Sequence, residues 1–429
     1  MSQINSLEQE IVSAIRESES EIIDLISDLV SHPSLLGYEK SGQEFMQDQF
    51  LQLDLEVDRF EIDNDILSKV KGYSPPVGEW KNHENVVGKF RSKKQTGKSL
   101  ILNGHIDVVP VGAEELWSSP PFSPVVRNGR IYGRGSGDMK AGIAAYLMAF
   151  RAIKKLGYVP AADVILQSVV EEECTGNGAL ACLHRGYTAD AAIIPEPFNE
   201  TIMSAQVGVM WLQIEVTGKP AHVLNDTSGI NAIESAFQIW QHLKTLTTDW
   251  NDPARRHPAF AKTKNPIKFN LGKIQGGEWA SSLPTKCRMD IRCGFFPDEE
   301  PDSVRAAIEN HLTRSVKTDL RLEGVDYKIS YAGFQSPGCV VDTTSQPIRT
   351  LASAHHDVLG KEVELFASAA TTDVRTFEIY GKIPATCYGP EATNIHAIDE
   401  SVSIESSLKV ASVLAIFIAR WCQLEKVTT

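Results

Sequence analysis

Short apolar runs alternate with longer segments of helical periodicity between Ser99 and Pro195. LILNGH, VILQSVV and AAIIPE have the length and composition of buried strands, whereas DMKAGIAAYLMAFRAIKKLG and GALACLHRG repeat their apolar positions as helices do. Strands and helices in alternation predict an α/β domain, with a mostly parallel sheet and helices on both faces. Upstream, the apolar spacing predicts one surface helix within residues 7–34, and the polar stretch 72–88 predicts a loop and a strand.

The middle of the chain has a different order of elements. Strand patterns at 207–218, 267–277, 286–296 and 327–333 are interrupted by helical patterns at 228–246 and 303–315. This strand-helix-strand-strand-helix-strand order is the split βαβ pattern of a ferredoxin-like α+β domain. We therefore expect such a domain at 206–332, inserted between two parts of the first domain at 1–205 and 333–429.

Composition excludes several classes of protein. With 429 residues, 42% hydrophobic and 23% charged, the chain is globular and long enough for two domains. A net charge of −13 argues against a nucleic-acid partner. No apolar run approaches the roughly 18 residues of a membrane span, and the acidic N-terminal segment does not resemble a signal peptide. Seven scattered cysteines without a C-x-x-C motif favour a reducing, cytoplasmic location.

Five segments place acids or imidazoles at predicted strand ends, the edge where α/β sheets bind ligands. These are NGHIDVVP (His105, Asp107), GRGSGDMKAG (Asp138), VVEEECTGNG (Glu172, Glu173), IIPEPF (Glu196) and TNIHAIDE (His396). Taken singly, each has an ordinary structural explanation. Asp138 could cap a helix. The Gly-rich segment before it could bind a phosphate, although the spacing of its glycines fits neither the dinucleotide-binding nor the P-loop pattern. The glutamates could form a solvated turn.

Taken together, two histidines and three acids form a ligand set for two cations that share one carboxylate. Mixed nitrogen and oxygen ligands without cysteine favour Zn²⁺, with Co²⁺ or Mn²⁺ as alternatives. Such ions, about 3.5–4 Å apart, hold a nucleophilic water and polarise a carbonyl. They would also explain EEE at 171–173, because one glutamate would ligate a cation while its neighbour takes a proton from the water. Glu171 is expected to turn toward solvent.

The motifs also carry a family resemblance. GHIDVVP, Trp117, GRGSGDMKAG, EEECTGNG, PEP, TGKPAH and YGPEATNIHAIDE together resemble the metallopeptidase M20 family, in particular its acetylornithine deacetylase and succinyl-diaminopimelate desuccinylase branch. The resemblance implies that one metal is bound by His105 and Glu196 and the other by Glu173 and His396, with Asp138 bridging them. It also implies that the inserted domain is a lid that forms a homodimer interface.

Further roles follow from the same resemblance. Glu172 would be the general base, Asp107 would orient His105, and His222 would reach the oxyanion from the lid, commonly across a dimer. Arg292 matches a family arginine that binds a substrate carboxylate, and Arg375 in TTDVRTF is a candidate for similar work. A surface ion pair is the alternative for both.

The sequence departs from the family pattern at two positions, of which Ser281 affects substrate recognition and Glu171 is expected to be tolerated. Ser281 replaces an asparagine that family members use for substrate binding, and Glu171 replaces an aspartate. These features lead to the hypothesis of a deacylase that removes an acetyl, succinyl or formyl group from an amino-bearing metabolite. A dipeptidase or carboxypeptidase and an aminopyrimidine deformylase of the same family are alternatives, and a non-catalytic binding protein is a third class. The absence of G-x-S-x-G and H-E-x-x-H argues against a serine hydrolase and a zincin.

Overall fold

The computed structural model describes residues 4–78 and 83–427, so part of the predicted 72–88 loop, residues 79–82, lies outside the described residues. Its core is a six-stranded sheet of order β1-β2-β7-β3-β8-β17. These strands are β1 (Glu56–Glu61), β2 (Glu84–Phe90), β3 (Leu100–His105), β7 (Val164–Val169), β8 (Ala192–Ile194) and β17 (Ala385–Cys387). β7, β3, β8 and β17 run parallel, whereas β2 is antiparallel to β7. The prediction of a mostly parallel sheet is confirmed.

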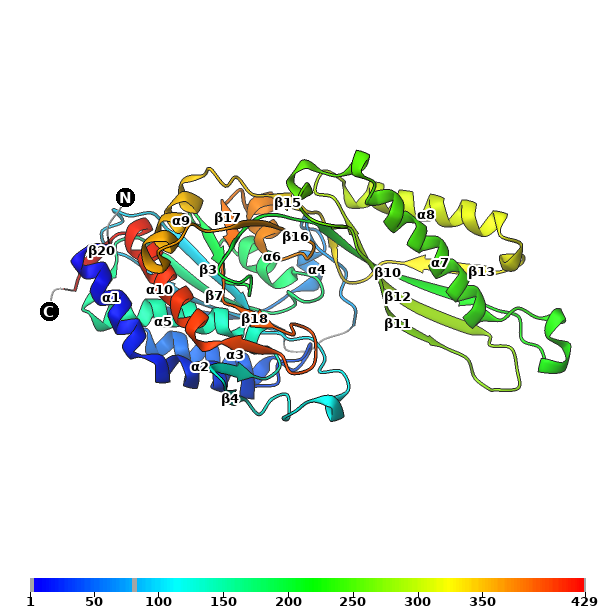
Figure 1. Ribbon diagram of the computed structural model, residues 1–429, viewed down its shortest axis with the longest axis horizontal. Helices are drawn as coiled ribbons and strands as arrows, with labels where there is room; N and C mark the ends of the chain where they lie inside the picture. The colour runs from blue at the N-terminus through cyan, green and yellow to red at the C-terminus, as the bar shows by residue number, and fades with distance from the viewer. Residues whose placement is uncertain (1–3, 79–82, 428–429) are drawn as a thin grey trace.

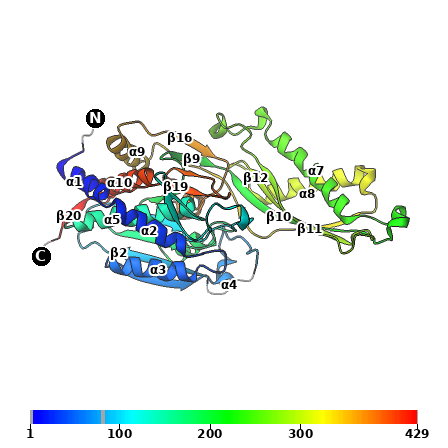
Figure 2. The same ribbon diagram turned by 60° about the horizontal axis from the view of Figure 1, so that its bottom comes forward.

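Helices cover both faces of this sheet (Figures 1 and 2). On one face, Phe50 of α3 (Lys40–Gln52) lies over Gly88, and Ile143 of α5 (Ala141–Lys155) lies over Gly104. Because both positions are glycine, the helices can pack close to the sheet. A Cβ at either position would lie only 2.8 Å from the nearest side-chain atom. On the other face, Asn85 of β2 donates a hydrogen bond to Gly178 of α6 (Asn177–His184). Strands β3, β7 and β8 are therefore buried along their whole length.

The N-terminal segment forms two helices rather than the one predicted. α1 (Ser6–Glu17) ends at Ser18, whose backbone leaves the helical region, and α2 (Glu19–Ser31) follows directly. The break lets both helices pack on the same core, because α10 (Ile404–Trp421) contacts each of them. α9 (Gln346–Leu359) completes this helical layer beside α10.

The inserted segment contains the predicted elements in the predicted order. They are β10 (Gly208–Thr217), α7 (Ala232–Trp250), β11 (Phe269–Gly276), β12 (Lys286–Phe295), α8 (Pro301–Thr318) and β13 (Asp326–Ser330). The strands form an antiparallel sheet of order β11-β12-β10-β13, the arrangement of a split βαβ unit. We call this part the lid; it extends away from the six-stranded sheet at the right of Figure 1. The ferredoxin-like prediction is confirmed.

The two parts have separate hydrophobic cores. The core of the lid draws its buried residues from the segment between Ala205 and Phe334, and the larger core draws on the chain before and after it. Boundaries at 206 and 332 remain a prediction that these cores support. None of the described helices combines the length and the apolar character needed to cross a membrane.

Candidate active site

Three adjacent parallel strands deliver most of the predicted ligands to one edge of the sheet. His105 is the last residue of β3, Glu172 and Glu173 follow the end of β7, and Glu196 follows β8. Because β3 lies between β7 and β8, the His105 imidazole is central. Its Nε2 atom lies 3.7 Å from Glu196 Oε1 and 4.0 Å from Glu172 Oε2. The structure thus gathers side chains that are up to 91 residues apart, as parallel strand ends allow.

Asp138 lies between two imidazoles. Its Oδ1 is 3.1 Å from His105 Nε2, and its Oδ2 is 3.3 Å from His396 Nε2. The helix-cap explanation is wrong, because α5 begins at Ala141 and has no side-chain hydrogen bond at its N-cap. The two imidazoles hold the pKa of the Asp138 carboxyl well below its usual range, although burial opposes this. One carboxylate oxygen facing each imidazole is the geometry that a shared ligand of two cations requires.

His396 joins this group from a loop between β18 (Ala392–Thr393) and β19 (Ser401–Ser403). Its Nε2 atom lies 3.0 Å from Glu173 Oε1 as well as 3.3 Å from Asp138. The negative charge of Glu173 is the main reason that the pKa of His396 is raised to about 11. The imidazole is about half exposed, at 49% of its side-chain surface, so this side of the group is open to a ligand.

The main chain of Asp107 determines how His105 presents its nitrogens. His105 Nδ1 donates to the Asp107 carbonyl oxygen at 2.8 Å, which leaves Nε2 facing the acids. The Asp107 carboxylate lies farther away, with Oδ1 3.7 Å from Nδ1. It accepts instead from the backbone amides of Glu172 and Glu173, at 3.3 and 3.1 Å. Asp107 thus orients the His105 imidazole through its backbone carbonyl and the backbone of the two glutamates through its side chain.

Glu171 does not turn toward solvent, so that expectation was wrong. Its side chain is fully buried, and its backbone adopts a left-handed conformation with φ of 65°. Oε1 lies 2.9 Å from His83 Nδ1, and Oε2 accepts from the Thr175 hydroxyl at 2.6 Å. The Glu171 carbonyl also accepts from the amides of the following turn. The first of the three glutamates therefore anchors the turn that carries the other two.

The donor set fits divalent cations. The structure contains two groups whose ligand atoms lie within 4.8 Å of one another, His105 with Asp138 and Glu173, and His105 with Glu172 and Glu196. Burial raises the pKa of both Glu172 and Glu196 well above the usual range, since several negative charges share a desolvated space. Among the described residues, Glu172 Oε1 is buried without a hydrogen-bond partner. Nearby cations would stabilise these ionised acids, which nothing else in the group neutralises fully.

The predicted lid residues are not part of this group in the described structure. His222 and Ser281 are exposed on neighbouring segments of the lid, where the Val223 amide donates to the Ser281 carbonyl. The His222 imidazole accepts from the Leu224 amide at 3.2 Å. Both remain predictions for a state in which the lid approaches the site.

The two predicted arginines bind main-chain carbonyls. Arg292 donates to the carbonyls of Lys268 in the lid and Ala369 in the larger part, at 3.2 and 2.8 Å. Arg375 is buried and donates to the carbonyls of Thr372 and Thr175. Within the part of the chain that the structure describes, neither arginine makes the surface ion pair that was the alternative.

Glu400 is a further residue of the site that the sequence motifs do not indicate. Its side chain is fully buried and accepts hydrogen bonds from three backbone amides of the segment 135–138. Glu400 lies in the same TNIHAIDE motif as His396, but an acid at the end of a loop is ordinarily exposed. Only the fold brings it against residues more than 260 positions earlier.

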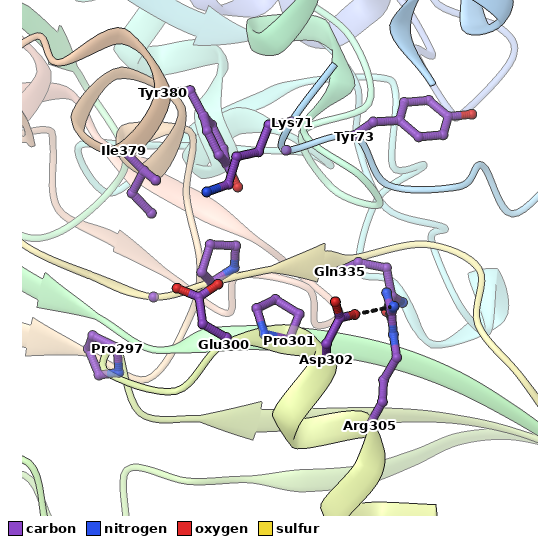
Figure 3. Close-up of a pocket in the computed structure, with 13 residues that line it drawn as sticks. Lys71, Tyr73, Pro297, Glu300, Pro301, Asp302, Arg305, Gln335, Ile379 and Tyr380 are labelled. Carbon is purple, nitrogen blue, oxygen red and sulfur yellow. Dashed lines mark hydrogen bonds and ion pairs between the residues drawn. The ribbon is translucent and has the colours of Figure 1, made fainter. Parts of the chain in front are cut away.

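A cavity of about 450 Å³ lies between the lid and the larger part of the molecule (Figure 3). Lys71 and Tyr380 line its upper side in this view, and Glu300 and Arg305 at the start of α8 line its lower side. Its lining includes none of the predicted site residues.

The chain is similar in sequence to two curated hydrolases. N-formyl-4-amino-5-aminomethyl-2-methylpyrimidine deformylase of Bacillus subtilis (strain 168) is 30% identical over 447 aligned residues, which cover 99% of each protein. Succinyl-diaminopimelate desuccinylase of Thioalkalivibrio sulfidiphilus is 26% identical over 77% of this chain and 86% of the relative.

Solved structures are similar in fold. The dipeptidase Dug1p of Saccharomyces cerevisiae and human carnosine dipeptidase 1 both superpose with a TM-score of 0.79, at 14% and 13% identity. The alignments cover 97% and 98% of this chain and 98% and 99% of those proteins, and at such identities they show the fold alone. Residues 101–420 match the model of peptidase family M20/M25/M40, so the resemblance seen in the motifs is confirmed and the chain belongs to that family.

Proposed function

We propose that this M20-family hydrolase removes a small acyl group from an amino-bearing metabolite by hydrolysing a linear amide bond. A formyl group on an aminomethylpyrimidine is the substrate that we favour. The similarity to the Bacillus subtilis deformylase over 99% of both chains supports this choice, and acetyl and succinyl groups are the alternatives. The observation that carries the reaction class is the Asp138 carboxylate, with one oxygen toward His105 and the other toward His396.

Five side chains would hold two divalent cations. We infer that His105 and Glu196 bind one and that Glu173 and His396 bind the other, with Asp138 shared. Zn²⁺ suits this mixed nitrogen and oxygen donor set, and Co²⁺ and Mn²⁺ are alternatives. When bound, the cations would supply Lewis-acid polarisation of the amide carbonyl and of the attacking water.

Glu172 is the general base in this proposal. Burial raises its pKa, so the carboxylate readily takes a proton from water and then returns it to the leaving amine. The Asp107 carboxylate holds the backbone amide of Glu172, which keeps the side chain directed at the group of ligands. His222 would donate a hydrogen bond to the developing oxyanion once the lid closes, from the same chain or from a partner.

The test is a substrate panel with a defined metal content. Metal-stripped protein is loaded with Zn²⁺, Co²⁺ or Mn²⁺ and assayed with formyl, acetyl and succinyl derivatives of the aminomethylpyrimidine, together with dipeptides. We expect deformylation to be fastest, to disappear with EDTA and to return when the metal is restored. Faster cleavage of dipeptides would overturn the substrate assignment, and full activity in EDTA would overturn the metal assignment. A homodimer formed through the lid and a cytoplasmic location belong to the same proposal.

A further inference from the structure

We propose that Glu400 is a positioning residue that fixes Asp138 between the two histidines. This inference deepens the proposed function and rests on its metal site. The Gly-rich motif GRGSGD resembles a phosphate-binding loop, and the proposed chemistry does not explain this resemblance. Successive backbone N–H groups in such loops form a concave site that binds anions. In this protein the anion is a carboxylate of the same chain.

The contacts of Glu400 use both carboxylate oxygens. Oε1 accepts from the amides of Gly137 and Asp138 at 3.0 and 2.9 Å, and Oε2 accepts from the Gly135 amide at 3.1 Å. The glycines make this approach possible. A Cβ at Gly137 would lie 2.6 Å from Ala392 Cβ and 3.3 Å from Glu400 Oε1, so a side chain would clash with Ala392 and crowd the carboxylate.

Arg134 compensates the buried charge. Its guanidinium donates to Glu400 Oε2 at 2.6 Å, and both side chains are at least 98% buried. The same guanidinium lies over the ring of Trp117 and donates to the Pro110 carbonyl at 3.2 Å. Trp117 in turn donates to the Val111 carbonyl at 2.9 Å. Arg134 therefore connects Glu400 to the segment that follows His105 and Asp107.

The arrangement connects three segments that carry predicted ligands. Glu400 holds the backbone of Asp138 directly and follows His396 by four residues in the same motif. Arg134 extends the connection to the chain after His105. Because Asp138 must face both histidines at once, a small displacement of its backbone would disturb both cation sites. Partners that hold a ligand in place typically contribute 10–100-fold to metal affinity.

A purely structural role for Glu400 is the competing explanation, and Glu8 provides a matched control. Glu8 is also a buried carboxylate paired with an arginine, since its oxygens lie 2.7 and 3.1 Å from Arg420 nitrogens. This pair joins α1 to α10 and touches none of the ligand segments. Glu8→Gln should therefore lower the thermal stability without changing metal affinity.

Glu400→Gln is the decisive variant. All four partners of Glu400 are donors, and the glutamine –NH₂ cannot accept, so either orientation of the amide loses two contacts. Metal-stripped wild type, Glu400→Gln and Glu8→Gln are titrated with Zn²⁺ in competition with a chromophoric chelator, and their thermal unfolding is recorded without metal. We expect about 10–100-fold weaker Zn²⁺ binding for Glu400→Gln and unchanged binding for Glu8→Gln.

Three results would overturn the proposal. Wild-type affinity in Glu400→Gln would remove the positioning role and leave the proposed function intact. Equal weakening in Glu8→Gln would assign the loss to general destabilisation. Absence of Zn²⁺ binding by the wild type would remove the proposed function and this inference together. If Glu400→Gln does not fold, Arg134→Lys replaces it. Lysine keeps the charge, but one ammonium nitrogen on a shorter side chain replaces the two guanidinium nitrogens that contact Glu400 and Pro110. Unchanged affinity in that variant would equally contradict the proposal.

Discussion

Replacing Glu172 by glutamine tests the proposed general base without disturbing the rest of the site. The side chain is 7% exposed, and its Oε1 has no hydrogen-bond partner among the described residues. Its Oε2 lies 4.0 Å from His105 Nε2, too far for a hydrogen bond. The substitution is nearly isosteric, and it removes the negative charge together with the ability to accept and return a proton. General-base catalysis contributes about 10²–10⁴-fold, which corresponds to about 2.7–5.5 kcal/mol of activation free energy.

The assay compares kcat/KM of zinc-loaded wild type and Glu172→Gln on the formylated aminomethylpyrimidine, with the zinc content of each sample measured by atomic absorption. We expect kcat to fall by at least 10²-fold with zinc content unchanged, because Glu172 belongs to neither inferred cation site. The variant should unfold at the same temperature or higher, since a neutral amide replaces a buried carboxylate. Activity within threefold of wild type would refute the assignment. Loss of zinc in parallel with activity would show that Glu172 is a ligand instead.

Other variants test separate parts of the site. Asp138→Asn should weaken binding of both cations at least tenfold in Zn²⁺ titrations, since one neutral amide replaces the carboxylate they share; loss of one ion only would argue against sharing. Glu171→Gln should destabilise the protein by about 1–3 kcal/mol, because it removes the carboxylate 2.9 Å from the buried His83 imidazole and leaves Glu39, 3.8 Å away, as its charged neighbour. Burial opposes the charged form of His83, but Glu171 and Glu39 raise its pKa above the unfolded value of about 6.5. This stabilisation is complete below pH about 6.5 and is lost as pH rises through the folded pKa, so the difference in unfolding temperature should shrink at high pH. His222→Ala should lower kcat without changing zinc content or stability, because the exposed imidazole accepts a hydrogen bond from the neighbouring Leu224 amide and is not buried. An unchanged kcat would exclude His222 as the oxyanion donor. Arg375→Lys should lower the unfolding temperature with little change in KM, since buried carbonyls lose their donor at about 1–3 kcal/mol each; a large increase in KM alone would restore a role in substrate binding.

The fold and the meeting of the ligand segments could be predicted because both depend on local pattern. Short, mostly apolar segments at 100–105, 164–170 and 191–196 indicate buried parallel strands, and parallel strands end at one edge. His105, Glu173 and Glu196 follow from that rule alone. The order of elements in the lid likewise specifies its sheet, since a split βαβ unit has few alternative topologies.

Interactions between distant segments could not be predicted from the same patterns. Glu171 is buried in contact with His83, which lies 88 residues earlier in the chain. No periodicity in the sequence indicates that these two residues form a pair. The carbonyl of Asp107 holds His105 while its carboxylate binds two amides, a division of roles that depends on backbone conformation. The apolar spacing does not indicate the break at Ser18, because helical spacing of apolar residues continues across it. Only the backbone conformation of Ser18 leaves the helical region.

The two arginines show how the structure changes the reasoning about substrate. The sequence prediction that Arg292 and Arg375 bind a substrate carboxylate relies on the shape of the guanidinium, whose paired N–H donors match the two carboxylate oxygens. In this fold the terminal nitrogens of Arg292 donate to two carbonyls, one in the lid and one in the larger part, and Arg375 donates to carbonyls inside the protein. Binding a substrate carboxylate would require these bonds to break, and at Arg375 it would leave the buried carbonyls of Thr372 and Thr175 without this donor. The arrangement therefore favours a substrate without a carboxylate, such as a formylated aminopyrimidine, over a dipeptide.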